Sequence, residues 1–423
     1  MSSDPILLDV TRLIARGWAR RTPTGIDRVC QAYLRRFAGH AQAVIQHRGA
    51  VCTLRPGASR ILFDMLLDDG PDFRRRLAAF APRALASAVS AVPGATYINV
   101  GHTDFDLDSH ARWAQRHALR SVYLIHDLIP IIHHTHCRPH AVRRHRGRVM
   151  GALRHGTGIV IGSHAVARDL GDFARSHRLA APSVLVAPLA GETLTPSRSD
   201  PAGGAPYFLC VGTIESRKNH HMLLDVWQEL CTRMGARTPR LVIVGQWGRG
   251  SETVRARLTN PLFGNHVTHI DRCTDDRLAD LMVGAQALLM PTMAEGFGLP
   301  MAEALAMGIP VIASDLPCFR EVGQGIPNLL PPSDTKAWEA LIVDFHGDHP
   351  ERRRQVAALP GYRPSSWDHH FMQLEAWLPT LAIPRSTEAA TGKGGAAGAP
   401  RGMPAGVYAR YADPKRLSTE GPR

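Results

Sequence analysis

Residues 290–311 read MPTMAEGFGLPMAEALAMGIPV, an apolar run interrupted by glycine and proline. The overlapping residues ALLMPT predict a strand over 287–292. A helix is predicted to begin near Pro300, because proline favours the first helical position, and to stop at Gly308. A buried strand, a short glycine turn and a helix in this order are typical of sheets built from parallel strands. The stretch therefore indicates an α/β fold.

The turn between this strand and helix contains Gly296 and Gly298. Glycine lets the backbone come close to a ligand, because it carries no side chain. The start of the helix adds unpaired N–H groups and a partial positive charge. Together these features predict a cradle for an anion, and phosphate is the anion that such cradles commonly bind.

Two acids, Glu295 and Glu303, flank the turn eight positions apart. A carboxylate only accepts hydrogen bonds, so Glu303, in the first turn of the helix, suits the vicinal hydroxyls of a ribose. Glu295 suits the hydroxyls of a second polyol, and a phosphate between two such groups describes a sugar nucleotide. Taken alone, the spacing favours a simpler interpretation, in which Glu303 complements the helix dipole and Glu295 is a solvated loop acid.

The bulk composition narrows the class of protein. At 423 residues the chain is long enough for two or three domains. Its apolar runs are too short for a helix that crosses a membrane or for a signal peptide. Seven cysteines without a CxxC pair favour a reducing compartment, so we expect a cytoplasmic protein. The formal charge of +13 indicates either attraction to an anionic surface, substrate or polymer, or a solvated basic surface.

Apolar, strand-like runs alternate with amphipathic helical segments along most of the chain. Strands are predicted at 6–10, 43–47, 96–101, 121–127, 158–163, 183–189, 207–212, 240–246, 267–271, 287–292 and 310–315, with helices that include 25–37, 219–234 and 274–285. Continuous apolar strands between helices indicate parallel sheets that are covered on both faces. Ligands of such doubly wound sheets bind beyond the carboxyl ends of the strands, which in a two-domain protein would face a shared cleft.

The composition also predicts the domain boundaries. Residues 192–206 are polar and rich in proline and glycine, which is typical of a linker. We therefore expect one doubly wound domain over 1–195 and a second over 196–365. The pattern over 366–384 is that of an amphipathic C-terminal helix. Residues 385–423 are rich in glycine, alanine and proline without periodicity and predict a disordered tail.

The segment that begins at Glu295 resembles the signature of the retaining nucleotide-sugar glycosyltransferases of the GT-B fold, in sequence family four (glycosyl transferases group 1). Every fixed position of the pattern E-G-F-G-L-P-x-x-E-A-x-A-x-G-x-P-V-I-x-S is matched. The resemblance implies two Rossmann-like domains facing a cleft and a C-terminal crossover helix. It also implies a catalytic role for Glu295 and donor-binding roles for Glu295, Gly296, Phe297, Gly298, Leu299 and Glu303.

The residues VGTIESRKN, from Val211, place two cations, Arg217 and Lys218, in the loop after a strand that ends at Gly212. Arginine grips phosphate oxygens in a bidentate manner, and lysine acts as a mobile point charge. The segment resembles the phosphate-binding segment of the family, which implies donor-binding roles for all three residues and a catalytic role for the cations. Many members have an additional arginine where Thr213 stands, so either Arg217 carries more of the load or phosphate affinity is lower.

Three further segments resemble parts of the family. Residues 267–291 resemble the strand, turn and helix that lie against the nucleotide base, although Arg272 stands at a usual glycine position. The motif PTGIDRV implies that Gly25 allows close approach to the donor. His126 and Asp127 end an apolar strand, so both are expected on the acceptor side, where strand ends face the cleft. The resemblance implies a catalytic role for His126, which either contacts the transferred sugar or shapes the acceptor site, and Asp127 alternatively orients His126. The simpler interpretation of His126 is a structural histidine.

A histidine-rich segment follows, with His133, His134, His136, Cys137 and His140. Its spacing matches no familiar closed metal site, and the family manages phosphate without a bound metal. We therefore expect no metal and no cofactor, and interpret the segment as a flexible loop over the acceptor cleft. The next residues, RPHAVRRHRGRVM, are strongly basic and form either a solvated helix face or a surface for an anionic lipid or lipid diphosphate.

The resemblance leads to one functional hypothesis. We expect a retaining glycosyltransferase that moves a hexose from a nucleotide-diphosphate sugar to a glycan or a polyprenyl-diphosphate-linked acceptor. The motifs PTGIDRV and HDLIP resemble enzymes of bacterial surface polysaccharide synthesis, so GDP-mannose is the leading donor and a peripheral contact with the anionic inner membrane face follows. The alternative is a non-catalytic nucleotide-sugar or glycan-binding protein of the same fold. A dehydrogenase is disfavoured because no GxGxxG follows the first strand, and a nucleic-acid binder leaves the acidic clamps unexplained.

Overall fold

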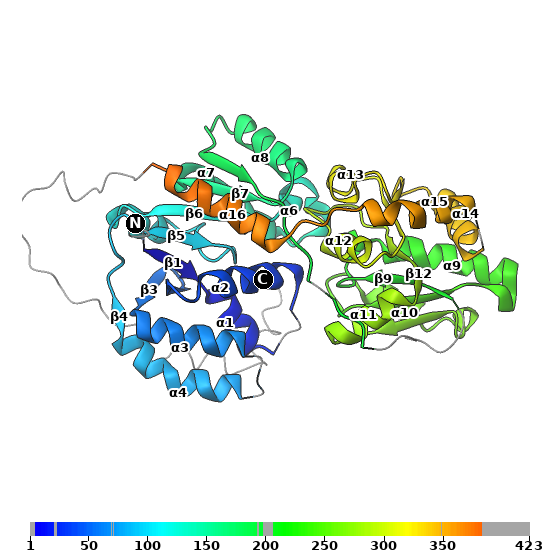
Figure 1. The fold of residues 1–423 in the computed structure, drawn as a ribbon, viewed down its shortest axis with the longest axis horizontal. Helices are drawn as coiled ribbons and strands as arrows, with labels where there is room; N and C mark the ends of the chain where they lie inside the picture. Colours follow the sequence, from blue (N-terminus) through cyan, green and yellow to red (C-terminus); the bar gives the residue numbers. More distant parts are fainter. Residues whose placement is uncertain are drawn as a thin grey trace, which may run out of the picture.

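The computed structural model describes residues 5–20, 23–68, 70, 72–192, 194–197, 206–347 and 349–382. These residues form two α/β domains that lie side by side, the first at the left of Figure 1 and the second at the right. The tail predicted over 385–423 lies outside the described residues.

The first domain is built on a sheet with strand order β4-β3-β2-β1-β5-β6-β7-β8. Its strands are β1 (Ile6–Asp9), β2 (Ala41–His47), β3 (Ala50–Leu54), β4 (Ala88–Val89), β5 (Thr96–Asn99), β6 (Arg120–Ile125), β7 (Gly158–Ile161) and β8 (Ser183–Val186). The pairings from β2 through β1 to β8 are parallel, as the sequence predicts. The pairs β2–β3 and β3–β4 are antiparallel, which corrects the expectation of a wholly parallel sheet.

The antiparallel edge follows from a tight hairpin between β2 and β3. Arg48 and Gly49 both have positive φ, at 48° and 84°. Two consecutive residues of this conformation match the twist of a two-residue β-hairpin and return the chain along its own edge. The domain boundary expected at 195 and 196 is not tested by these pairings and stays a prediction.

Helices cover both faces of the first sheet (Figure 1). One hydrophobic core includes Tyr33, Leu62 and Leu77, and the other core includes Val149 and Leu170. The helices are α1 (Thr11–Trp18), α2 (Gly25–Phe37), α3 (Pro56–Leu67), α4 (Phe73–Ala86), α5 (Asp108–Arg116), α6 (Ile129–Ile132), α7 (Pro139–His155) and α8 (His164–Ser176), with a 3₁₀ turn η1 (His134–His136). Every residue of β5, β6 and β7 is buried, which is typical of parallel strands covered on both sides.

The second domain has a parallel sheet of strand order β11-β10-β9-β12-β13-β14. Its strands are β9 (Tyr207–Val211), β10 (Arg240–Val244), β11 (Val267–Ile270), β12 (Ala285–Met290), β13 (Val311–Ser314) and β14 (Asn328–Leu330). Its helices are α9 (His220–Met234), α10 (Glu252–Arg257), α11 (Asp275–Val283), α12 (Leu299–Ala306), α13 (Pro317–Gly323), α14 (Thr335–His346) and α15 (Pro350–Ala358), with 3₁₀ turns η2 (Ser216–Lys218), η3 (Gly235–Arg237), η4 (Pro261–Phe263) and η5 (Leu359–Gly361). Trp227 and Trp338 are completely buried in its core.

The chain returns to the first domain at its C-terminal end. Helix α16 (Trp367–Trp377), followed by η6 (Leu378–Thr380), lies across the first domain and is drawn in orange in Figure 1. His370 Nε2 is 2.8 Å from the hydroxyl of Tyr33, and Arg36 donates two hydrogen bonds of 2.6 Å to Glu375. The two doubly wound domains and the crossover helix confirm the predicted fold class.

The described residues contain no helix that is both long and apolar enough to span a membrane.

Candidate active site between the two domains

The loop after β9 holds the two predicted cations. Gly212 has a φ of 139°, a conformation that glycine adopts readily, and the turn η2 then presents Arg217 and Lys218. The next residue, Asn219, donates a hydrogen bond of 3.1 Å to the carbonyl of Pro291. The phosphate-binding loop predicted after β9 is therefore tied to the end of β12, where the glycine turn begins.

The two glycines of the β12–α12 turn are required for different structural reasons. Gly298 has a φ of 100°, and a β-carbon there would lie 2.5 Å from Phe319. A β-carbon on Gly296 would lie 2.3 Å from the carbonyl oxygen of His126 in the first domain. Ser163 of the first domain also donates a hydrogen bond of 2.8 Å to the carbonyl of Gly296. The missing side chain of Gly296 thus makes room for the opposite domain, whereas the sequence pattern predicted room for a ligand.

Glu295 is the centre of a compact group of charges. Its carboxylate is paired with the ammonium of Lys218 and lies 3.3 Å from Nη1 of Arg217. Arg217 also reaches Glu215 through Nε at 2.8 Å and donates to the carbonyl of Ala294 at 2.9 Å. Two cations and two acids therefore meet at the carboxyl ends of β9 and β12.

The surroundings of this group fix its charges. Burial alone would raise the pKa of Glu295, but Lys218 and Arg217 outweigh burial and hold that pKa below its ordinary value. Burial would lower the pKa of Arg217, and the neighbouring acids Glu295 and Glu215 raise it instead. Glu295 and Arg217 therefore carry their charges at neutral pH, and the carboxylate of Glu295 pairs with both Arg217 and Lys218.

Glu303 lies in a different environment. It is the fifth residue of α12, so it belongs to the second turn rather than to the predicted first turn. Its Oε1 accepts a hydrogen bond of 3.2 Å from the backbone N–H of Glu192 and lies 3.6 Å from Nη1 of Arg28. Burial raises its pKa to about 7, although Arg28 acts in the opposite direction. Glu303 thus faces the first domain and the interdomain connection, and it titrates near neutrality.

Three histidines of the first domain gather opposite the glycine turn. His126 follows β6, and its Nε2 donates a hydrogen bond of 2.9 Å to the carbonyl of Val100. The ring of His102 lies 5.0 Å from that of His126 and 5.5 Å from that of His145. Burial lowers the pKa of His126 to about 4, so this imidazole is neutral at physiological pH with Nδ1 unprotonated.

Asp127 and the histidine-rich segment that follows it make local and interdomain hydrogen bonds. Asp127 Oδ1 accepts from the N–H of Ile129 at 2.9 Å at the start of α6. The segment from His133 to His140 that was predicted to be a flexible loop forms η1 and the start of α7. Its His136 lies 3.2 Å from the hydroxyl of Ser216 in the second domain. In the described ranges, no three His, Cys, Asp or Glu side chains are placed to bind one metal ion.

Gly25 brings a second helix start to the same place. It is the first residue of α2, and a β-carbon there would lie 3.4 Å from Leu299, the first residue of α12. Thr24 and Asp27 form a capping box, in which the backbone N–H of Thr24 donates a 2.7 Å hydrogen bond to Asp27. Two helix N-termini, one from each domain, therefore meet beside the charge cluster.

Residues 194–358 match the family described as "Glycosyl transferases group 1". The matched segment corresponds to the second domain. Its similarity to curated relatives is local: it is 35% identical over 121 residues to the serotype-specific mannosyltransferase WbdA of Escherichia coli, across 28% of this chain and 15% of WbdA. It is 28% identical over 166 residues to the O-antigen chain mannosyltransferase B of Escherichia coli, across 38% and 43% of the two chains. The chain therefore spans less than half the length of those relatives.

Solved structures show the same fold over nearly the whole chain. Anabaena Alr3699/HepE, in complex with UDP-glucose, superposes with a TM-score of 0.64 at 15% identity and covers 90% of this chain and 100% of its own. A sucrose-phosphate synthase from Thermosynechococcus elongatus gives a TM-score of 0.59 at 16% identity over 89% and 99% of the two chains. The chain thus has the GT-B fold.

The predicted residues divide between two facing surfaces. The second domain supplies the charge cluster and the α12 start, and the first domain supplies Gly25 and His126. Phe297 is buried at the contact between them, 3.6 Å from a β-carbon placed on Gly162. The predicted donor-side and acceptor-side residues do come together, and their roles stay predictions.

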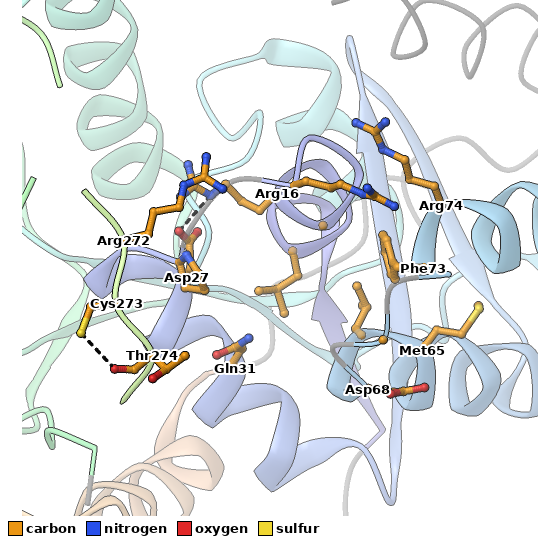
Figure 2. Close-up of a pocket in the computed structure, with 16 residues that line it drawn as sticks. Arg16, Asp27, Gln31, Met65, Asp68, Phe73, Arg74, Arg272, Cys273 and Thr274 are labelled. Atoms are coloured by element: carbon orange, nitrogen blue, oxygen red, sulfur yellow. Dashed lines mark hydrogen bonds and ion pairs between the residues drawn. The ribbon is translucent and has the colours of Figure 1, made fainter. Parts of the chain in front are cut away.

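Sequence reasoning missed the pocket of about 550 Å³ that Figure 2 shows, which is lined by residues of both domains. Its first-domain wall includes Arg16, Phe73 and Arg74, and the loop after β11 adds Arg272 and Thr274. The side chains come from segments far apart in the chain, so no local motif marks the pocket. Arg272, noted as a departure from the family glycine, lies at its rim.

Proposed function

We propose that this protein is a retaining glycosyltransferase that moves a hexose from a nucleotide-diphosphate sugar to a glycan or polyprenyl-diphosphate-linked acceptor in bacterial surface polysaccharide synthesis. The observation that carries the proposal is the cluster of Glu295 with Arg217 and Lys218 at the start of α12. GDP-mannose is the leading donor, because the two curated relatives named above are both mannosyltransferases.

The donor diphosphate would lie between the cations and the α12 start. Backbone N–H groups at a helix start attract phosphate, and Arg217 and Lys218 add two charge-assisted donors. On donor binding, the phosphate oxygens and the Glu295 carboxylate share the two cations. Glu295 is then placed to accept a hydrogen bond from a hydroxyl of the hexose, and Glu303 from hydroxyls of the ribose.

The same groups favour the transition state. As the bond between the anomeric carbon and the phosphate oxygen breaks, its electron pair passes to the leaving phosphate. Fixed cations stabilise that growing charge more than they stabilise the bound donor. The acceptor hydroxyl forms its bond to the anomeric carbon on the same face, and its proton passes to the leaving phosphate oxygen.

His126 fits a positioning role in this scheme. With a pKa of about 4 it is a weak base, so it is poorly suited to take the acceptor proton. Its backbone carbonyl lies against Gly296, so His126 faces the glycine turn through its main chain. We therefore propose that His126 contacts the transferred sugar and that the donor phosphate serves as the base.

The acceptor and the location follow from the same proposal. A lipid-linked acceptor would bring the first domain to an anionic membrane surface. Helix α7 exposes Arg143 and Arg146, and Ile132 of α6 is 47% exposed nearby in the chain. Basic residues beside an apolar one suit a peripheral contact with anionic lipid at the cytoplasmic face.

The test has two stages. Thermal-shift screening against UDP-, GDP-, ADP- and dTDP-sugars identifies the donor, and a transfer assay with that radiolabelled sugar follows. We expect one nucleotide class to stabilise the protein and the label to move to a lipid-linked acceptor with retained configuration. Stabilisation without transfer or donor hydrolysis would favour the non-catalytic binding protein, and a covalent glycosyl–enzyme would contradict same-face attack.

A further inference from the structure

Arg28, in helix α2 of the first domain, lies close to acids of two helices of the second domain. Its Nη2 lies 2.5 Å from the carboxylate of Asp275, at the start of α11. Its Nη1 lies 3.6 Å from the carboxylate of Glu303 in α12. Arg28 therefore bridges the domains beside the acid that the proposed function assigns to the ribose.

One end of this guanidinium is left incomplete. Nη1 is buried, and within the part of the chain that the structure describes it has no hydrogen-bond partner. The 3.6 Å separation from Glu303 is too long for a direct hydrogen bond. A buried N–H of a charged group without an acceptor is unfavourable and uncommon in folded proteins. The atom is thus poised for an acceptor that comes from outside the chain.

The pair of Arg28 and Glu303 selects the chemistry of that acceptor. The guanidinium only donates hydrogen bonds, and the ionised carboxylate only accepts them. A hydroxyl does both, because its hydrogen donates to Glu303 while its oxygen accepts from Nη1. The vicinal hydroxyls of a ribose offer two such groups side by side. A hydroxyl between the two side chains would also satisfy the buried N–H.

We infer that Arg28 is a donor-binding residue that reads the ribose hydroxyls together with Glu303. The inference rests on the proposed function, since it places the nucleotide at Glu303. It has a consequence for specificity: the site should prefer ribonucleoside diphosphates over their 2′-deoxy analogues, and so disfavour thymidine-diphosphate sugars. Because Arg28 belongs to the first domain, the contact also makes nucleotide binding hold the two domains together.

The experiment compares Arg28→Met with a matched control by isothermal titration calorimetry. The control is Arg35→Met, since Arg35 lies two turns on in the same helix, is half exposed, and lies 3.5 Å from Glu192 of the interdomain connection. The ligands are GDP and UDP with their 2′-deoxy forms. We expect Arg28→Met to weaken binding of the preferred ribonucleotide about ten- to hundredfold, the range for a hydrogen bond to a charged group. Arg35→Met should bind as the wild type does.

The deoxy ligands separate a ribose contact from a structural one. The wild type should bind the ribonucleotide about tenfold more tightly than its deoxy form, and Arg28→Met should remove most of that preference. Equal losses for both forms would show that Arg28 only bridges the domains, and would overturn the inference, as would unchanged binding by a folded Arg28→Met. The melting temperatures of Arg28→Met and of Arg28→Lys, which keeps the charge, check that folding is intact. If the wild type binds neither these four nucleotides nor ADP nor dTDP, the proposed function itself falls.

Discussion

Glu295 and Glu303 belong to the same short segment, yet they lie in opposite electrostatic environments. Both carboxylates are largely buried, with side-chain exposures of 12% and 5%. Burial raises the pKa of Glu303 to about 7, while Lys218 and Arg217 keep that of Glu295 below its ordinary value. The difference shows that the number of close cations, and not the depth of burial, decides which acid is permanently ionised.

This contrast suggests a division of labour. In the proposed function, the cations that keep Glu295 ionised also bind the diphosphate, which assigns Glu295 to the reacting end of the donor. Glu303 has one distant guanidinium and one backbone N–H, so its charge depends on pH and on what binds beside it. Each prediction below perturbs one side of the comparison.

The largest effect is expected for Glu295→Ala. The substitution removes the hydroxyl acceptor from the sugar end of the site and leaves two cations without their shared partner. Turnover should fall about 10²- to 10³-fold, as for the loss of a preorganised electrostatic contact. The matched control is Glu215→Ala, which removes the other acid near Arg217. If both variants lost the same activity in steady-state kinetics, Glu295 would have no special place at the reacting end.

Lys218→Met should have the next largest effect. It removes a cation from the leaving phosphate and keeps a similar apolar stem. We expect a loss of transition-state stabilisation of about 3 kcal/mol, seen as a lower kcat with a smaller change in KM. Arg257→Met is a useful control, because Arg257 pairs with Asp225 away from the site. A variant with normal kcat would contradict the role of Lys218 in charge stabilisation.

Glu303→Gln tests the pH-sensitive side. The carboxylate accepts hydroxyls only when it is ionised, so nucleotide affinity of the wild type should rise as the pH increases through about 7. The glutamine variant should bind about tenfold more weakly at pH 8, as expected for one lost hydrogen bond, and show a flatter pH profile. Calorimetry at pH 6, 7 and 8 (values chosen to bracket the pKa of about 7) measures both. Equal slopes for the two proteins would show that another group titrates.

Stability should respond to the same group with a defined sign. The folded pKa of Glu303 is raised from an ordinary value of 4.5 to about 7. The folded protein therefore holds this proton more tightly than the unfolded chain does, and the resulting stability is lost as the pH rises from 4.5 to about 7. Glu303→Gln should remove this part of the pH dependence of the melting temperature.

The smallest effect is expected for Ser163→Ala. Its hydroxyl caps α8 by accepting from Val166 at 3.2 Å and donates across the gap to Gly296 at 2.8 Å. Losing both should cost about 1 kcal/mol of unfolding free energy, with a modest rise in KM because the glycine turn is less firmly held. Denaturant unfolding and steady-state kinetics provide the two numbers. A large fall in kcat would mean that Ser163 does more than hold the turn.

Local features of this molecule could be predicted well from its sequence. The helix predicted over 25–37 is α2 with the same bounds, and Ser163 caps α8 as its position suggests. The strand, glycine turn and helix around Glu295 depend on neighbours in the chain, so their order can be predicted from one stretch of sequence. Even there, the capping residue of α11 is Thr274, although the side chain of the adjacent Asp275 could also cap a helix.

The rest depends on contacts between distant residues. Arg28 and Asp275 are 247 positions apart, and Glu192 and Glu303 are 111 apart, so neither partner predicts the other. The raised pKa of Glu303 follows from its burial among such distant segments of the chain. The short strands β3 and β4 were missed for a similar reason, since pairing at a sheet edge stabilises segments whose own pattern is weak.

The central claim is that a diphosphate rests on Arg217 and Lys218 at the start of α12, and calorimetry of a nucleoside diphosphate against its monophosphate tests it most directly. The measurement uses the base that the thermal-shift screen selects, with wild type and Lys218→Met. The account predicts that the wild type binds the diphosphate at least about tenfold more tightly than the monophosphate, the gain from one charge-assisted contact, and that Lys218→Met loses most of this gain. An equal preference for the diphosphate in both proteins, or none in the wild type, would contradict it.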